Sequence, residues 1–370
     1  MDQKHLGRKD TVNFGSYYTP SWLVDIVYSL IAKNMPRFDD YTMLDTSCGY
    51  GGFLRGTRTI GADIDEKALE TARQKSGIYF NHNSLFEIAR SQYKLAENEK
   101  VIIVGNPPYN DTTSIIRNDI KKTVFLRDAD VVSRDVGLSF LLSYNKLAAD
   151  FVCVLHPLSY LIKKTNFEAL RQFKNNYKLI DSVVVSSAVF SATSKATSFP
   201  IIIALYERNP LGMDYAYIQQ YRFKTNDDHL FFMKEFDTIG HYIPKYPNHK
   251  TVREQDTAAY FYTLRDINAL KRAATFLEKE TANAVRVTKI NLPYYCYVDV
   301  FKDYTPHVPY YFGNSDIMIN NDHFQELAPL FVSRSARNHP KLYLESKKYN
   351  DEETKLTGYF KQLLGAHYVD

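Results

Sequence analysis

A short apolar run that ends in a rigid turn is the feature that most constrains this chain. Val101-Ile102-Ile103-Val104 is followed at once by Gly105 and then by Asn106-Pro107-Pro108-Tyr109. An apolar run that meets a glycine and two prolines predicts a buried parallel strand that stops abruptly. Open α/β sheets bind their ligands where such strands end. The sequence therefore predicts a binding site at this turn.

The turn carries hydrogen-bond acceptors and few competing donors. Two prolines fix φ and lack N–H groups, so the backbone is stiff and presents carbonyl oxygens. The side-chain oxygen of Asn106 and the main-chain oxygen of Pro107 can each accept one hydrogen of a planar –NH2 group. Tyr109 can stack on the ring that carries the amine. An ordinary turn after a strand is the alternative interpretation, and the surrounding motifs decide between the two.

Three motifs precede the turn in the sequence. They are Thr19-Pro20, the glycine-rich segment Asp45-Thr46-Ser47-Cys48-Gly49-Tyr50-Gly51-Gly52-Phe53, and Gly61-Ala62-Asp63-Ile64-Asp65. Together with Asn-Pro-Pro-Tyr they resemble the S-adenosylmethionine-dependent N6-adenine DNA methyltransferases. The order of the motifs resembles the gamma class, which is found in type II restriction-modification systems. The resemblance covers residues 14–208, and no motif is recognised beyond them.

The resemblance implies a site for the cofactor S-adenosylmethionine at the strand ends. Asp45 is placed to attract the positively charged amino group of the cofactor's methionine. The turn Ser47-Cys48-Gly49 lets the backbone approach the ligand closely. Asp63 matches the acidic residue that accepts hydrogen bonds from the ribose hydroxyls, and Ile64 would pack on the adenine.

Three further segments complete the implied cofactor site. In the resembled family, the segment before the first helix borders the methionine end of the cofactor. Here Tyr18, Thr19 and Pro20 occupy it, and Thr19 is expected to cap the helix that follows. Asn83 stands where the family usually has an aspartate, and its amide oxygen can accept the same hydrogen bond from the adenine amine. Asn106 is expected to border the cofactor as well as the substrate.

The reaction implied by the resemblance is methyl transfer to N6 of a flipped-out adenine. Adenine's amine is a poor nucleophile because its lone pair is delocalised into the ring. Two fixed acceptors localise that lone pair toward the sulfonium methyl, without a covalent intermediate or a metal ion. A base inside a duplex is unreachable and has to flip. Tyr109 and Phe190, which matches a second aromatic of the family, would replace the lost stacking at roughly 1–3 kcal/mol per ring.

The alternation of strand and helix patterns predicts the fold. Further apolar runs at 151–157, 179–185 and 199–206 alternate with helical patterns such as 135–147. This alternation predicts an α/β domain with a doubly wound, Rossmann-like methyltransferase sheet and helices on both faces. The turn Asn209-Pro210-Leu211-Gly212 ends it. We therefore expect a catalytic, cofactor-binding domain at 1–212 and an α+β target-recognition domain at 213–370.

Sequence patterns that predict helices and strands are weaker in the expected second domain. Residues 266–280 are predicted as a helix and 292–297 as a strand.

Basic residues that suit phosphate contacts lie in two places, the polar stretch after Tyr109 and a segment near the C-terminus; they are Arg117, Lys121, Lys122, Arg334, Arg337 and Lys341. Solvated surface explains these residues equally well.

Charge, cysteine content and the length of apolar stretches limit the kinds of protein that this chain can be. The formal net charge of +4 permits nucleic-acid binding without indicating it. The three cysteines are far apart, which argues against a disulfide framework and a zinc site. A basic apolar leader and an apolar stretch of about 18 residues are both lacking, so we expect a cytoplasmic protein without a membrane partner. The expected partner is double-stranded DNA, alongside a cognate restriction endonuclease that acts separately.

Four other functions share parts of this pattern. Related Asn-Pro-Pro-Tyr enzymes methylate RNA adenines or the glutamine amide of release factors. The glutamine enzymes carry a recognition domain before the cofactor motif, where only about forty residues stand here. A silent methyltransferase-like binding subunit would typically lose the Asn-Pro-Pro-Tyr or the glycine-rich turn, and both are intact. Cytosine-N4 enzymes more often have serine in place of Asn106. An RNA target is the hardest of these to exclude.

Overall fold

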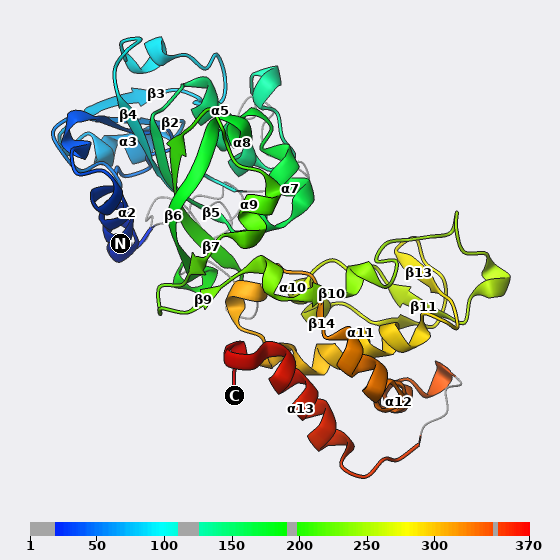
Figure 1. The fold of residues 1–370 in the computed structure, drawn as a ribbon. Helices are drawn as coiled ribbons and strands as arrows, with labels where there is room; N and C mark the ends of the chain where they lie inside the picture. The colour runs from blue at the N-terminus through cyan, green and yellow to red at the C-terminus, as the bar shows by residue number, and fades with distance from the viewer. Residues whose placement is uncertain (1–18, 110–125, 191–197, 343–346) are drawn as a thin grey trace. The chain divides into compact units, whose positions relative to one another are not determined.

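A computed structural model describes residues 19–109, 126–190, 198–342 and 347–370. The chain forms two compact units, Met1–Met233 and Lys234–Asp370 (Figure 1). The predictions for Tyr18, Arg117, Lys121 and Lys122 lie outside the described residues. No helix among the described residues is long and apolar enough to cross a lipid bilayer.

The first unit is built on a seven-stranded sheet in the order β3-β2-β1-β4-β5-β7-β6. Its strands are β1 (Thr42–Asp45), β2 (Thr59–Asp63), β3 (Ile78–Asn81), β4 (Val101–Gly105), β5 (Phe151–Pro157), β6 (Tyr177–Ser186) and β7 (Pro200–Arg208). Strands β1 to β5 pair in parallel, and β7 runs antiparallel to both β5 and β6. All residues of β4 are buried, as its continuous apolar run predicts.

Helices cover both faces of this sheet. They are α2 (Ser21–Asn34), α3 (Glu66–Ala72), α5 (Val136–Lys146), α6 (Ser159–Ile162), α7 (Lys164–Ala169), α8 (Gln172–Asn176) and α9 (Tyr215–Gln220). The buried stripe of α2, with Leu23 and Val27, packs in one core with Ile203 and Leu205 of β7. Figure 1 shows α2 on one side of β5 to β7 and α5 with α8 on the other. The predicted doubly wound α/β sheet is confirmed.

Two local features of the first unit differ from expectation. The glycine-rich segment after β1 leads through turns directly to β2, so the alternation of strand and helix is interrupted between these two strands. The unit also continues past the turn at Gly212. Its last elements are α9, β8 (Phe223–Lys224) and β9 (Leu230–Phe231). Phe223 and Phe231 are fully buried, and Thr225 forms a bridge with Val184 of β6, so 213–233 pack as part of the first unit.

The second unit combines small antiparallel sheets with three longer helices. Its strands are β10 (Asp237–Thr238), β11 (Ala259–Tyr262), β12 (Phe276–Leu277), β13 (Ala284–Val287) and β14 (Met318–Ile319), and its helices are α10 (Ile267–Arg272), α11 (Leu292–Tyr304), α12 (Asn321–Asn338) and α13 (Glu352–Leu364). The helix predicted over 266–280 is therefore shorter, and β12 follows it.

An aromatic core explains why the strand predicted at 292–297 is wrong. Tyr297 of α11 is fully buried, and its ring lies 5.1 Å from Phe331 of α12 and 5.8 Å from Tyr359 of α13. Its hydroxyl donates to the carbonyl oxygen of Met318 at 2.5 Å. Apolar rings at 297, 301 and 304 follow the helical period, so packing against two helices overrides the β propensity of tyrosine. Part of the chain's aromatic content thus serves this core.

Candidate functional site

The carboxyl ends of β1, β2 and β4 bring the predicted site residues to one edge of the sheet. Asp45 ends β1, Asp63 ends β2, and Asn106 follows β4 directly. β1 pairs in parallel with β2 on one side and with β4 on the other. Because neighbouring parallel strands end at the same edge, Asp45 and Asn106, which are 61 positions apart in sequence, lie at the same edge.

Asp45 is a buried carboxyl group with one unused oxygen. Only 1% of the residue is exposed. Its Oδ1 accepts a hydrogen bond from the Ser47 N–H at 3.1 Å, whereas Oδ2 has no hydrogen-bond partner. Burial raises the pKa of Asp45 to about 8, the Ser47 N–H opposes this increase, and the charge of Asp63 adds to it. A buried carboxyl with a free oxygen suits a cationic ligand, which would supply the missing partner.

Gly105 makes room for the Asp45 carboxyl. Its φ is +147°, and a Cβ atom at this position would lie 2.7 Å from Asp45 Oδ1. Any other residue would both strain the backbone and displace the carboxylate. The sequence pattern predicted only that the strand stops abruptly at Gly105. A glycine at the end of a buried strand is itself a signal of close backbone approach.

Asp63 ties the glycine-rich turn to the end of β2. Its Oδ2 accepts from the Gly49 N–H at 2.8 Å, and its Oδ1 accepts from the Asp65 N–H at 2.9 Å. Desolvation raises the pKa of Asp63, although both N–H groups oppose this. The neighbouring side chain of Ile64 is 50% exposed, which suits packing against a flat ligand. The ribose contact of Asp63 stays a prediction; a carboxylate has about four lone-pair sites, and these backbone bonds do not use all of them.

Asn106 presents an unpaired acceptor at the same edge. Its Oδ1 is buried and has no hydrogen-bond partner, while its Nδ2 donates to Thr19 Oγ1 at 3.1 Å. The expected capping role of Thr19 is wrong. Helix α2 has Pro20 at its N-cap without any side-chain cap bond, and the Pro20 carbonyl accepts from the Leu23 N–H at 3.0 Å. The helix begins one residue later than expected, so the Thr19 hydroxyl is available to Asn106.

Two of the other predicted cofactor contacts, Asn83 and Cys48, have structural roles of their own. Asn83 Nδ2 donates to the Leu126 carbonyl at 2.7 Å, and its Oδ1 accepts from the Leu85 N–H at 3.0 Å. Asn83 could accept from a ligand only through its second lone pair. Cys48 is buried beside Leu69, and burial raises the pKa of its thiol. The buried Oγ of Ser47 has no partner.

Tyr109 is half-buried after the rigid turn, and Phe190 lies deeper. Pro107 is buried, Pro108 and Tyr109 are partly exposed, and Tyr109 packs against the core cluster that contains Phe190. Only 2% of Phe190 is exposed. In this structure Phe190 therefore packs in the core, and stacking on a base would require its ring to move. Its stacking role stays a prediction.

Gly137 near the start of α5 is a neighbour of Tyr109 that lies outside the predicted motifs. A Cβ at Gly137 would lie 3.0 Å from the Cβ of Tyr109 and 2.5 Å from the hydroxyl oxygen of Tyr160. Any larger residue would therefore push on Tyr109. A glycine inside a helical pattern is a signal of such close packing.

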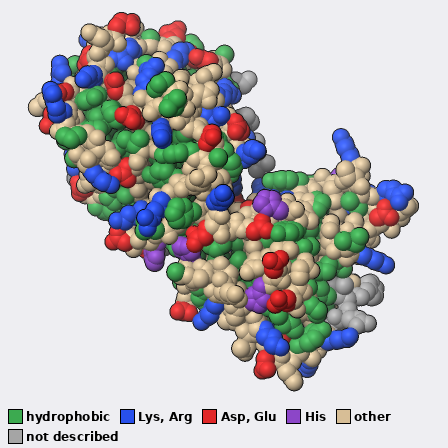
Figure 2. Space-filling model, viewed as in Figure 1, with side chains coloured by type: hydrophobic (Ala, Val, Ile, Leu, Met, Phe, Trp, Pro, Cys, Tyr) green, Lys and Arg blue, Asp and Glu red, His purple; other side chains and the backbone are tan. Residues whose placement is uncertain are grey.

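The predicted phosphate contacts of the second unit are engaged in ion pairs. Arg334 Nη1 lies 3.1 Å from Glu353 Oε2. Arg337 pairs with Glu352, and Lys341 pairs with Glu278. Figure 2 shows Lys and Arg side chains interspersed with Asp and Glu on the visible face. Phosphate binding by these residues stays a prediction, and it would have to compete with the carboxylates.

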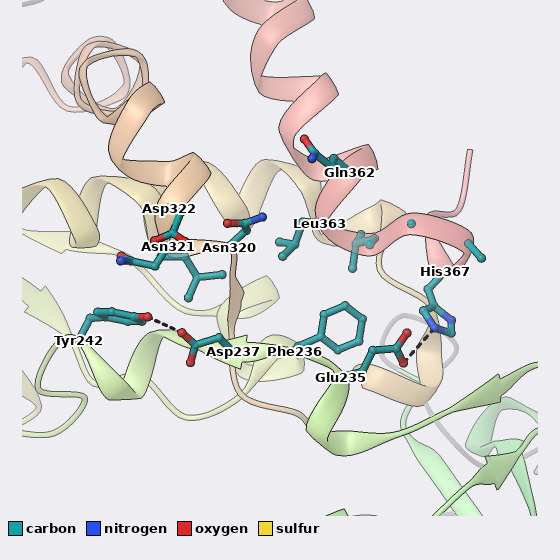
Figure 3. A pocket seen from close by; sticks show the side chains of 14 residues that line it. Glu235, Phe236, Asp237, Tyr242, Asn320, Asn321, Asp322, Gln362, Leu363 and His367 are labelled. Carbon is teal, nitrogen blue, oxygen red and sulfur yellow. Dashed lines mark hydrogen bonds and ion pairs between the residues drawn. The ribbon is translucent and has the colours of Figure 1, made fainter. Parts of the chain in front are cut away.

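A cavity of about 520 Å³ lies within the second unit, beside the start of α12 and the end of α13 (Figure 3). Its lining includes the carboxylates of Glu235, Asp237 and Asp322. Tyr242 donates a hydrogen bond to Asp237, and His367 Nε2 lies 3.4 Å from Glu235 Oε2. This negative lining repels phosphate, so the cavity does not suit a nucleic-acid backbone.

The described residues contain no group of three or more His, Cys, Asp or Glu that could hold a metal ion.

Comparison with known proteins finds neither a matching family model nor a matching curated protein. Among solved structures, 126 chains match. A type I restriction-modification system methyltransferase subunit from Streptococcus thermophilus is 17% identical with a TM-score of 0.40, over 60% of this chain and 48% of that chain. TrmN from Thermus thermophilus is 14% identical with a TM-score of 0.32, over 51% and 49%. Magnesium protoporphyrin IX methyltransferase from Synechocystis PCC 6803, with bound SAM, is 13% identical with a TM-score of 0.30, over 51% and 79%. The chain thus spans about half the length of the first two proteins.

Proposed function

We propose that this chain is an S-adenosylmethionine-dependent methyltransferase that acts on N6 of adenine in a specific DNA sequence. The observation that carries the proposal is the unpaired Oδ1 of Asn106, held buried at the end of β4 beside β1. A buried amide oxygen without a partner is costly, at about 1–3 kcal/mol, unless a ligand supplies a donor. An exocyclic amine is such a donor.

The residues at the ends of β1 and β2 fit the cofactor. Bound S-adenosylmethionine supplies an electrophilic methyl group on its sulfonium. The unpaired oxygen of Asp45 would accept from the amino group of its methionine, Asp63 would accept from the ribose, and the exposed Ile64 would pack on the adenine. Gly49, with φ +50°, allows the backbone of the turn to approach the ligand without a clash.

The Asn-Pro-Pro-Tyr turn fits the substrate amine. Asn106 Oδ1 and the Pro107 carbonyl each accept one amine hydrogen, which favours the pyramidal nitrogen of the transition state. Tyr109 is partly exposed and would stack on the base that carries the amine. Because the two prolines hold the acceptors in place, little reorganisation accompanies the transfer.

The second unit suits target recognition in double-stranded DNA. The motif order supports a DNA adenine substrate, and 234–370 form a compact unit that the proposed reaction itself does not use. In this proposal the enzyme protects DNA as the modification partner of a separate restriction endonuclease. RNA adenines and a protein glutamine amide are the competing substrates.

Long-read sequencing that detects base modification tests the proposal. DNA from cells that express this chain is expected to carry N6-methyladenine in one sequence context, and DNA from cells that express Asn106→Ala is not. Methylation found only in RNA, or only on a glutamine of a protein, would assign the enzyme to that substrate instead. Methylated DNA with no preferred sequence context would contradict a specific target.

Asp45 should release a proton when it binds the amino group of the cofactor. With a pKa of about 8, Asp45 is mostly protonated at pH 7 in the free protein, and the bound ammonium group should lower that pKa. A large fraction of one proton per site should then be released at pH 7. Calorimetry of S-adenosylhomocysteine binding, in two buffers of different ionisation enthalpy, measures this number.

An Asp45→Asn variant supplies the control. It should bind the ligand more weakly and release no proton. The pH dependence of stability gives a second readout. Because the pKa of Asp45 is higher in the folded than in the unfolded protein, its contribution to the free energy of unfolding decreases as the pH rises from about 4 to about 8. The stability of the variant should change less over that interval. Equal proton release by both proteins would exclude Asp45 as the group that titrates.

A further inference from the structure

The connection from β1 to β2 contains backbone that no helix or strand supports. Residues 46–58 join the two strands without a helix, and they include the glycine-rich turn at 47–49. Within the described part of the chain, residues 52–57 make no backbone–backbone hydrogen bond, although the side chains of Phe53 and Leu54 are buried. The backbone N–H and C=O groups of this stretch therefore need partners from side chains or from water.

One side chain of α2 supplies such partners. The Tyr28 hydroxyl donates to the Phe53 carbonyl oxygen at 2.8 Å and accepts from the Arg55 N–H at 3.1 Å. The Arg55 carbonyl oxygen, also at 3.1 Å, is a second acceptor for the same hydrogen. A carbonyl can only accept and an N–H can only donate, so the phenol meets both kinds of backbone group in this stretch. Burial raises the pKa of Tyr28 to about 12, so the hydroxyl keeps its proton at neutral pH.

The Arg55 side chain forms a second, weaker link to the same helix. Its guanidinium carbon lies 5.4 Å from the centre of the Tyr28 ring, and its Nη1 lies 2.6 Å from Asp25 Oδ1 of α2. An ion pair between exposed side chains contributes little, because water and salt screen it. The phenol is therefore the stronger polar link between α2 and residues 52–57.

We propose that Tyr28 is a positioning residue that holds the glycine-rich turn in the shape that binds the cofactor. This inference rests on the proposed function. Asp63 holds the turn at Gly49, and Tyr28 holds the backbone that follows it. Because both attachments exist before the ligand arrives, less conformational entropy is lost on binding. Without the Tyr28 hydroxyl, residues 52–57 would move more freely, and the ligand would have to order them.

Tyr28→Phe isolates the hydroxyl, because this variant keeps the ring. Its calorimetric Kd for S-adenosylhomocysteine should rise about five- to tenfold, the equivalent of about one hydrogen bond. The single-turnover rate of methylation at saturating cofactor should stay within about twofold of the parental rate, because the bound turn has regained its shape. Backbone hydrogen exchange at 52–57 should be faster in the free variant than in the free parent protein, and bound ligand should reduce the difference.

Tyr217→Phe is a matched control. Tyr217 of α9 donates to the Leu179 carbonyl oxygen at 2.7 Å, and Lys178 Nζ lies 5.0 Å from the centre of its ring. This variant therefore also loses a bond from a phenol to the backbone and keeps a cation near the ring. Leu179 lies near the start of β6, away from the glycine-rich turn. The Kd for S-adenosylhomocysteine should stay within about twofold of the parental value.

Asp25→Asn tests the weaker link. It breaks the ion pair with Arg55 and leaves the Tyr28 hydroxyl in place. Its Kd for S-adenosylhomocysteine should also stay within about twofold of the parental value. A rise as large as in Tyr28→Phe would assign the positioning to the ion pair and contradict the inference.

The remaining outcomes are also decisive. A parental Kd in Tyr28→Phe would overturn the positioning role while leaving the proposed function intact. An equal rise in Tyr217→Phe would assign the effect to a general loss of stability. A weaker Kd without faster exchange at 52–57 would show that the backbone is no looser, and the inference would fail. If the parent protein itself binds no S-adenosylhomocysteine, the proposed function fails, and that result is distinct from all of these.

Discussion

Asn106→Ala is expected to lower the methylation rate by about 10²–10³-fold or more while leaving cofactor affinity nearly unchanged. The substitution removes an acceptor whose hydrogen bond strengthens as the amine nitrogen becomes pyramidal. It should therefore raise the free energy of the transition state and leave substrate and cofactor binding nearly unchanged. Single-turnover methylation of a duplex that contains the target site measures the rate. Calorimetry with S-adenosylhomocysteine measures the affinity.

Asn145→Ala is a matched control for this variant. Asn145 lies near the end of α5, and its Oδ1 accepts from Asn176 Nδ2 at 2.9 Å, away from the carboxyl ends of the strands. The Asn145→Ala variant should retain the parental rate.

Fluorescence of 2-aminopurine at the target position should still report a flipped base in Asn106→Ala, because Tyr109 remains. If Asn106→Ala methylates adenine at a near-normal rate, the turn does not hold the amine, and the proposed mechanism has to be abandoned.

A protein that ends at Met233 is expected to bind the cofactor with near-parental affinity and to lose site-specific DNA binding. The first unit contains Asp45, Asp63 and Asn106 and ends at this residue. The second unit is the proposed reader of the target sequence. Fluorescence anisotropy with cognate and scrambled duplexes should show a difference in affinity for the full chain and none for the truncated protein.

The end point of this truncation follows from the structure. A chain cut at Asn209 would remove β8 and β9, whose Phe223 and Phe231 are fully buried, and should be less stable. Thermal denaturation of the two truncated proteins compares them. Retained sequence discrimination by a folded 1–233 protein would place recognition in the first unit. The basic residues between Tyr109 and α5 would then be the first to test.

The elements of the first unit could be predicted because their signals are local. An apolar run, the residues that end it and the helical spacing of apolar positions all involve neighbouring residues. The four residues after Gly105 predicted an acceptor site without knowledge of the strand order. In the second unit the same reasoning was wrong at 292–297, where burial of Tyr297 between helices decided the outcome.

The sequence by itself determined where the strands end and which chemical groups stand at those ends. Only the tertiary structure decided which of these groups meet. It placed Thr19 against Asn106, left oxygens of Asp45 and Asn106 without partners, buried Phe190, and paired Arg334 and Arg337 with carboxylates. The physical reason is that strand ends depend on local backbone preferences, whereas a side chain's partner depends on which distant segments the folded sheet brings beside it.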